Sequence, residues 1–120
     1  MTNQLSFTKH EHKILPNFRQ KINTAESSED LKKFFVYTAT ELFEDIFTDK
    51  IKFSYDDIAL MPETPPHYVL HQRLLDSEIF TSVWNNSDLP RLISHLAEST
   101  MNHYKRLAKN PEKAEKKIRR

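Results

Sequence analysis

The chain has 120 residues, with 18 basic residues against 17 acidic ones, no cysteine and no glycine. This length suits one domain that buries a core without a metal or a disulfide. The absence of cysteine excludes disulfides, thiolate zinc sites and cysteine nucleophiles. Tight type I′ hairpins, phosphate-binding loops and dinucleotide fingerprints are disfavoured, because each relies on the conformational freedom of glycine. The composition therefore favours helices joined by turns of asparagine, serine and proline.

The two ends of the chain differ from its middle. Residues 1–15 show no apolar periodicity, which predicts a flexible N-terminus, and they lack the apolar run of a signal peptide. Beyond Pro111, residues 111–120 predict a frayed basic tail. We expect one domain over residues 16–110. Because 18 consecutive apolar residues occur nowhere, we also expect a cytoplasmic protein that does not span a membrane.

An amphipathic helix is predicted over residues 29–48, and the serine pair at 27–28 can cap it. Apolar residues then recur every three or four positions, a spacing that only a helix gathers onto one face. These residues are Leu31, Phe34, Phe35, Ala39, Leu42, Phe43, Ile46 and Phe47. Before this helix, Pro16 suits the first turn of a shorter helix that carries Phe18 and Ile22.

The middle of the chain is less regular. Residues 51–55 alternate between apolar and polar side chains, which allows a short strand. The three prolines between residues 62 and 66 then forbid a continuous helix. Residues 67–70 suit either a short strand or the start of a helix, and we favour the helix.

Two further helices are predicted near the C-terminus. Asp76 or Ser77 can cap a short one whose inward residues are Ile79, Phe80, Val83 and Trp84. Ser87 or Asp88 can cap a long one with the apolar stripe Leu89, Leu92, Ile93, Leu96, Ala97, Thr100, Tyr104 and Leu107. The predicted fold is mainly α, a small helical bundle with two long amphipathic helices. Its thirteen aromatic residues exceed what one copy is expected to cover, which predicts a homodimer.

A binding surface is predicted over residues 57–73, where regular structure breaks beside a rigid proline turn. Its candidate residues for a ligand or partner include His67, Tyr68, His71 and Arg73. The guanidinium of Arg73 can bind a phosphate or a carboxylate in a bidentate manner. The alternative is that this segment only connects and packs across the helices.

No pattern in the chain places a nucleophile beside a base and an orienting group, so we predict no enzyme, no catalytic residue and no cofactor. One alternative is a nucleic-acid-binding protein whose basic tail contacts phosphates through Lys113, Lys116, Lys117, Arg119 and Arg120. A second is a helical metal-binding protein, because His67 and His71 would share one face of a helix.

Two segments carry a resemblance to a known family. Residues 57–60 read Asp-Ile-Ala-Leu, and residues 65–69 read Pro-Pro-His-Tyr-Val. With the helices predicted before and after them, they resemble the signature region of the late competence development family of small bacterial regulatory proteins. The chain lacks the cysteine pair that this family often carries before the aspartate. The resemblance implies a non-enzymatic regulator that binds a cyclic dinucleotide, with Asp57, Pro66 and Tyr68 near its functional surface.

Together these observations predict a small cytoplasmic regulatory or adaptor protein that acts by binding rather than by catalysis. Its expected partner is another protein, a second copy of the chain or a nucleotide ligand.

Overall fold

The computed structural model describes residues 6–48 and 50–109. Within these residues the chain forms five α-helices, one 3₁₀ turn and two short strands. In chain order they are α1 (Thr8–Asn23), α2 (Ser28–Phe47), η1 (Tyr55–Asp57), β1 (Ile58–Leu60), β2 (Tyr68–Leu70), α3 (Gln72–Leu75), α4 (Glu78–Asn85) and α5 (Leu89–Lys109). The prediction of a mainly α fold with two long amphipathic helices is confirmed.

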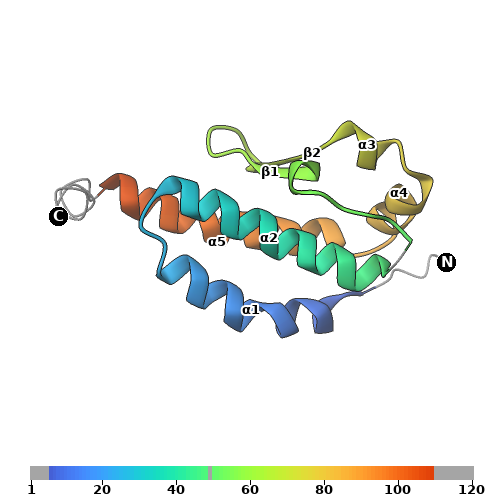
Figure 1. The fold of residues 1–120 in the computed structure, drawn as a ribbon, viewed down its shortest axis with the longest axis horizontal. Coiled ribbons are helices and arrows are strands. Elements are labelled where there is room, and N and C mark those ends of the chain that lie inside the picture. The colour runs from blue at the N-terminus through green and yellow to red at the C-terminus, as the bar shows by residue number, and fades with distance from the viewer. Residues whose placement is uncertain (1–5, 49, 110–120) are drawn as a thin grey trace.

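The three long helices lie side by side, and the hairpin of β1 and β2 covers them. Figure 1 shows α1 along one side of α2, α5 behind α2, and the hairpin on the side away from α1. The helices α1 and α5 both pack against α2, and β1 rests on α2 as well. The hairpin and α3 lie on top of the bundle, and α4 lies at its end beside the start of α5; we call the hairpin, α3 and α4 together the upper layer.

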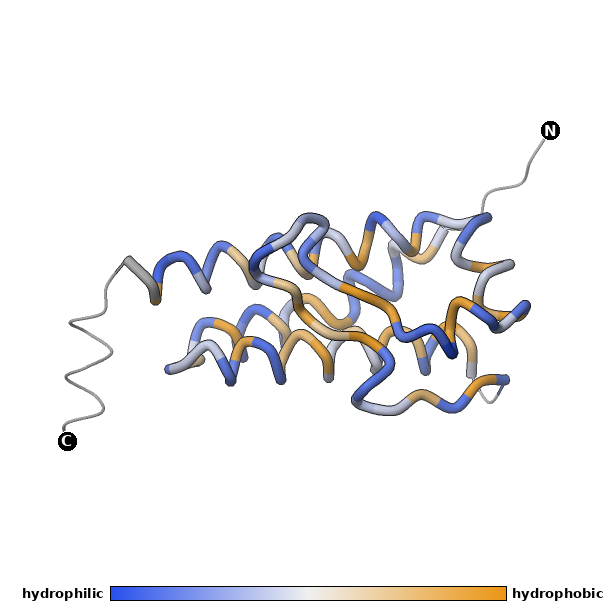
Figure 2. Tube along the Cα trace, turned by 90° about the horizontal axis from the view of Figure 1, so that it is seen from above, coloured by the Kyte–Doolittle hydropathy of each residue, from blue (hydrophilic) through white to orange (hydrophobic). Residues whose placement is uncertain are grey.

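The two predicted apolar stripes form the core. Hydrophobic and hydrophilic residues alternate along each long helix in Figure 2, as amphipathic helices require. Phe35 of α2 and Leu96 of α5 both have 0 % of their surface exposed. The helix α2 is capped by Ser27, whose hydroxyl accepts a hydrogen bond of 3.2 Å from the backbone N–H of Asp30.

The helix α1 begins at Thr8, so the prediction of a flexible end up to residue 15 is wrong for residues 8–15. The inward positions of this part are Glu11 and Ile14, and they continue at helical spacing into Phe18 and Ile22. The apolar pattern of this helix could not be recognised in the sequence, because one of its four inward positions is Glu11 rather than an apolar residue. Pro16 consequently lies inside the helix, at an exposed position, rather than in its first turn.

The strands also differ from the prediction. The structure has no strand over residues 51–55, where Phe53 packs into the core with the rings of α2 and α4 instead. Residues 68–70 form β2 and pair antiparallel with residues 58–60, so the favoured helix at this position is wrong and the strand is confirmed. A helix cannot pass through His67, whose φ is 75°.

Six of the thirteen aromatic side chains form one cluster inside a single copy of the chain: Phe43, Phe47, Phe53, Tyr68, Phe80 and Trp84. Phe43 of α2 lies 5.2 Å from Phe53 and 5.4 Å from Phe80 of α4, measured between ring centroids. Phe80 stacks on Trp84 at 5.4 Å, and Trp84 meets Tyr68 of β2 edge to face at 6.2 Å. These rings tie the upper layer to the bundle. The number of aromatic residues therefore does not by itself require a second copy of the chain, and the homodimer stays a prediction.

Candidate functional site

The six predicted site residues all lie in the upper layer. Asp57 ends η1, Pro66 and His67 belong to the turn of the hairpin, and Tyr68 begins β2. His71 is the N-cap of α3 and Arg73 lies inside that helix. The structure brings Asp57, His71 and Arg73 into one polar cluster, and it places the other three elsewhere on the hairpin.

The centre of this cluster is the carboxylate of Asp57, whose side chain is only 4 % exposed. It accepts a hydrogen bond of 3.1 Å from Nε of Arg73 and a second, very short one from Nη2 of the same side chain. The backbone N–H of Ser54 donates a third bond of 2.7 Å and closes a capping box around η1. Bidentate hydrogen bonding by Arg73 gives the Asp57–Arg73 pair a fixed geometry.

The protonation state of the cluster follows from these bonds. Burial by itself would raise the pKa of the Asp57 carboxyl, but the hydrogen bonds from Arg73 and Ser54 outweigh it and hold this pKa below its usual value. The same hydrogen bond raises the pKa of the Arg73 guanidinium. Asp57 is therefore an anion at neutral pH, and the pair remains charged.

The pair holds three segments of the chain together. Arg73 Nη2 also donates to the backbone carbonyl of Lys52 at 2.7 Å, while Nδ1 of His71 accepts from the backbone N–H of Arg73 at 2.9 Å. The backbone N–H of His71 donates to the carbonyl of Asp57 at 2.8 Å. The cluster thus fixes α3 and the open end of the hairpin against the segment that leaves α2.

This geometry changes the role predicted for Arg73. Its Nε and Nη2 groups are both engaged within the chain, so they are not available to fork onto a phosphate. The side chain is 47 % exposed, yet its Nε and Nη2 groups donate to Asp57 and Lys52. We therefore interpret Asp57 and Arg73 as the support of a surface rather than as its ligand-contacting groups.

The predicted metal pair is not formed. His67 and His71 lie at opposite ends of β2 and not on one helical face. Nδ1 of His67 contacts the carbonyl of Met61 at 3.2 Å, and Nδ1 of His71 caps α3. Among the residues that the structure describes, no group of three histidine or acidic side chains is placed to hold a metal ion.

Tyr68 faces inward from the hairpin. Its ring packs against Trp84, and burial raises the pKa of its hydroxyl, an effect that a hydrogen bond with Ser94 of α5 partly offsets. Pro66 lies in the exposed turn, joined to Pro65 by a cis peptide bond. These residues shape the hairpin from below and at its tip.

The surface of the upper layer carries most of the large apolar side chains that the bundle leaves uncovered. In the described part of the chain, the exposed ones are Tyr37, Tyr55, Met61, Val69, Leu75 and Ile79. We call the last four the hairpin surface; they lie on or beside the hairpin, α3 and the first turn of α4. Sequence reasoning missed Met61, Val69 and Leu75 and predicted Ile79 to point inward. No helical spacing could have signalled that Leu75 and Ile79 are both exposed, because α3 ends at Leu75 and α4 begins at Glu78.

Two open depressions lie beside these elements. One, of about 540 Å³, is lined by Glu78, Ile79, Thr81, Ser82 and Asn85. The other, of about 460 Å³, is lined by Glu44, Thr48, Ile51, Lys52 and Phe53. Neither is lined by any of the six predicted site residues, so neither supports a nucleotide pocket built on them.

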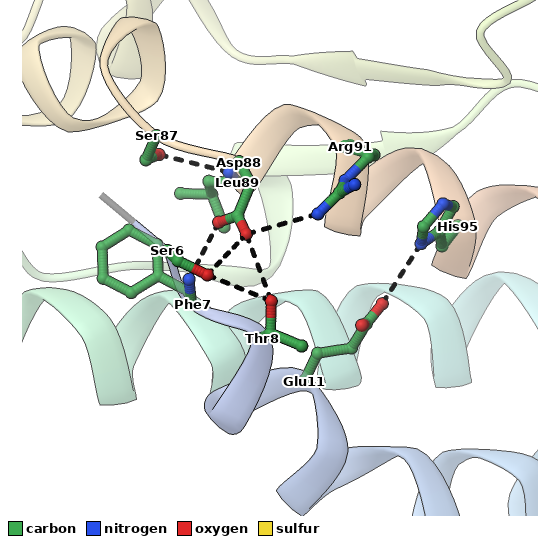
Figure 3. A network of polar contacts seen from close by, with 9 residues as sticks. All are labelled: Ser6, Phe7, Thr8, Glu11, Ser87, Asp88, Leu89, Arg91 and His95. Atoms are coloured by element: carbon green, nitrogen blue, oxygen red, sulfur yellow. Dashed lines mark hydrogen bonds and ion pairs between the residues drawn. The ribbon is translucent and has the colours of Figure 1, made fainter. Parts of the chain in front are cut away.

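A second polar network lies at the start of α1 and explains why this helix begins so early (Figure 3). The carboxylate of Asp88, just before α5, accepts hydrogen bonds from the backbone N–H of Phe7 at 2.8 Å and from the hydroxyl of Ser6 at 3.0 Å. Burial would raise the pKa of Asp88, but the bonds from Phe7, Ser6 and Thr8 hold it below its usual value. An anion at this position stabilises the N-terminus of α1.

Two histidine contacts also hold α1 against α5 and α2. His95 of α5 lies 3.4 Å from the buried carboxylate of Glu11, and His10 lies 2.5 Å from the carboxylate of Asp45 on α2. The polar face of α5 is therefore partly covered by α1. We interpret this network as structural, because each of its carboxylates already has a partner.

No family model, curated protein or solved structure matches the chain. The fold and the site define a small, mainly α bundle with a two-stranded hairpin, which is supported by an ion pair between the buried Asp57 and the half-exposed Arg73. None of the helices within residues 6–48 and 50–109 combines the length and the apolar character that a membrane-spanning segment needs. The five basic residues of the predicted nucleic-acid tail lie outside the described residues.

Proposed function

We propose that the chain is a non-enzymatic regulatory or adaptor protein of the cytoplasm that binds a protein chain through the hairpin surface. The observation that carries this proposal is the concentration of exposed apolar side chains on one layer. Val69 is 49 % exposed, Ile79 48 % and Leu75 44 %, although a full apolar core lies directly beneath them. Clustered exposed apolar groups are typical of interaction surfaces.

Rigidity supports the same proposal. The Asp57–Arg73 pair and the aromatic cluster fix the hairpin and α3, so little conformational freedom is lost when a partner binds. The residues that resemble the late competence development family lie in this hairpin and its support. We favour a protein partner over a cyclic dinucleotide, because two of the arginine groups that suit a phosphate are engaged with Asp57 and Lys52.

Photo-crosslinking tests this proposal in cells that make the protein. A photo-reactive amino acid replaces Val69 in one variant and Gln20, an exposed residue of α1, in the matched control. We expect adducts of defined mass from position 69 and none of the same mass from position 20. The proposal is wrong if position 69 gives no adduct, or if both positions capture the same proteins.

A further inference from the structure

Among the described residues, no further strand pairs with the edge of β2 that faces away from β1. Met61 N–H donates to the carbonyl of His67 at 2.7 Å, and His71 N–H donates to the carbonyl of Asp57 at 2.8 Å. In an antiparallel ladder hydrogen-bonded pairs alternate with pairs that are not bonded. Ile58 lies opposite Leu70 and Leu60 lies opposite Tyr68, and both are therefore non-hydrogen-bonded pairs. Their N–H and C=O groups point away from the partner strand.

For Tyr68 and Leu70 this direction leads to the outer edge of the sheet. The sheet has the order β1-β2, and no third strand pairs with it within residues 6–48 and 50–109. Both strands are edges of this two-stranded sheet, but β1 packs closely on α2, and no helix in the described part of the chain packs as closely against β2. Four backbone groups of β2, two donors and two acceptors, are thus presented for pairing. An edge of this kind is a template for another strand.

Side-chain burial indicates which residues a strand that pairs with β2 would need. Ile58 and Leu60 of β1 are 1 % and 5 % exposed, and they share the inner face of the sheet with Tyr68 and Leu70. Tyr68 and Leu70 pack on the core but remain only partly buried. A further strand with apolar residues on its inner face would cover them.

From these observations we infer that β2 pairs with β2 of a second copy of the chain and makes a four-stranded sheet across a twofold axis at Val69. This inference rests on the proposed function, since it names a second copy as the partner. In antiparallel pairing about Val69, Tyr68 faces Leu70 of the second copy and Leu70 faces its Tyr68. The four open backbone groups then match those of the second copy, as an isologous interface requires.

The charge and the outer face of β2 favour self-pairing. The strand has no lysine, glutamate or proline within Tyr68–Leu70, the residues that commonly block edge-to-edge association. Val69 points to the outer face, where it is exposed. Across the twofold axis the two Val69 side chains become direct neighbours of the closely spaced kind, so each covers the other.

Charge complementation at position 69 tests this arrangement. Because Val69 is half exposed, Val69→Lys and Val69→Glu are both expected to keep the helical circular dichroism spectrum of the wild type. Sedimentation equilibrium should show a concentration-dependent dimer for the wild type. It should also show dimerisation weakened about tenfold or more in each variant alone, because like charges meet across the axis. An equimolar mixture of the two variants should regain wild-type dimerisation as a heterodimer.

A strictly monomeric wild type at millimolar concentration would overturn the inference, as would a mixture that dimerises no better than the separate variants. A monomer that still forms adducts with another protein from position 69 would overturn only the second copy as partner and leave the proposed function standing. A charge-neutral control, Val69→Thr, should dimerise within about threefold of the wild type.

Discussion

Replacing Phe43 by alanine is expected to lower the free energy of unfolding by about 4 kcal/mol. Phe43 is fully buried, and its ring meets those of Phe47, Phe53, Phe80 and Trp84. Truncation removes contacts to three different segments at once and leaves a cavity that their backbones cannot close. Urea denaturation followed by circular dichroism measures the loss.

The matched control for this substitution is Tyr37→Ala on the same helix. Tyr37 is 51 % exposed and meets Tyr55 at 5.6 Å near the surface, so its loss should change stability by less than about 1 kcal/mol. Equal losses in the two variants would show that Phe43 does not lie at the junction of the bundle and the upper layer.

Breaking the Asp57–Arg73 pair has the second largest expected effect. Arg73→Ala leaves a buried carboxylate with the backbone N–H of Ser54 but without its guanidinium partner, and we expect a loss of about 3 kcal/mol. Asp57→Ala should be milder, about 2 kcal/mol, because the half-exposed guanidinium of Arg73 can turn to water. The measurement is again the free energy of unfolding in urea.

A double-mutant cycle separates this pair from its surroundings. The double variant should lose about 1 to 2 kcal/mol less than the sum of the two single variants, because the second substitution removes a group whose partner has already gone. Asp56→Ala, an exposed neighbour, serves as the control and should have little effect. Additive losses would mean that the two side chains do not act as a unit.

Local patterns in the sequence were enough to predict α2, α4 and α5. The stripes of α2 and α5 and the caps Ser27 and Ser77 depend on residues within a few positions of one another, so they can be read without knowing the fold. The helix α1 could not be delimited in this way. It begins at Thr8 because Asp88, some eighty residues later, accepts hydrogen bonds from its first turn, and no local pattern carries that information.

The candidate site divides in the same way. Its location on the irregular segment could be proposed from the prolines and the break in periodicity. The roles of its residues could not, because Asp57 meets Arg73 only once the register of the hairpin places residue 57 beside residue 71. That register also decides that Val69 faces outward while Tyr68 faces the core. A shift by one residue would exchange these two side chains between the faces.

Hydrogen exchange at the backbone amides of β2 tests most directly whether the hairpin edge is the working surface of this protein. The amides of Tyr68 and Leu70 point outward, whereas the amide of Val69 already pairs with β1 and provides an internal reference. Raising the protein concentration across the range in which dimers form should slow exchange at Tyr68 and Leu70 at least tenfold and leave Val69 nearly unchanged. Exchange at Tyr68 and Leu70 that stays fast while another segment becomes protected would contradict the account.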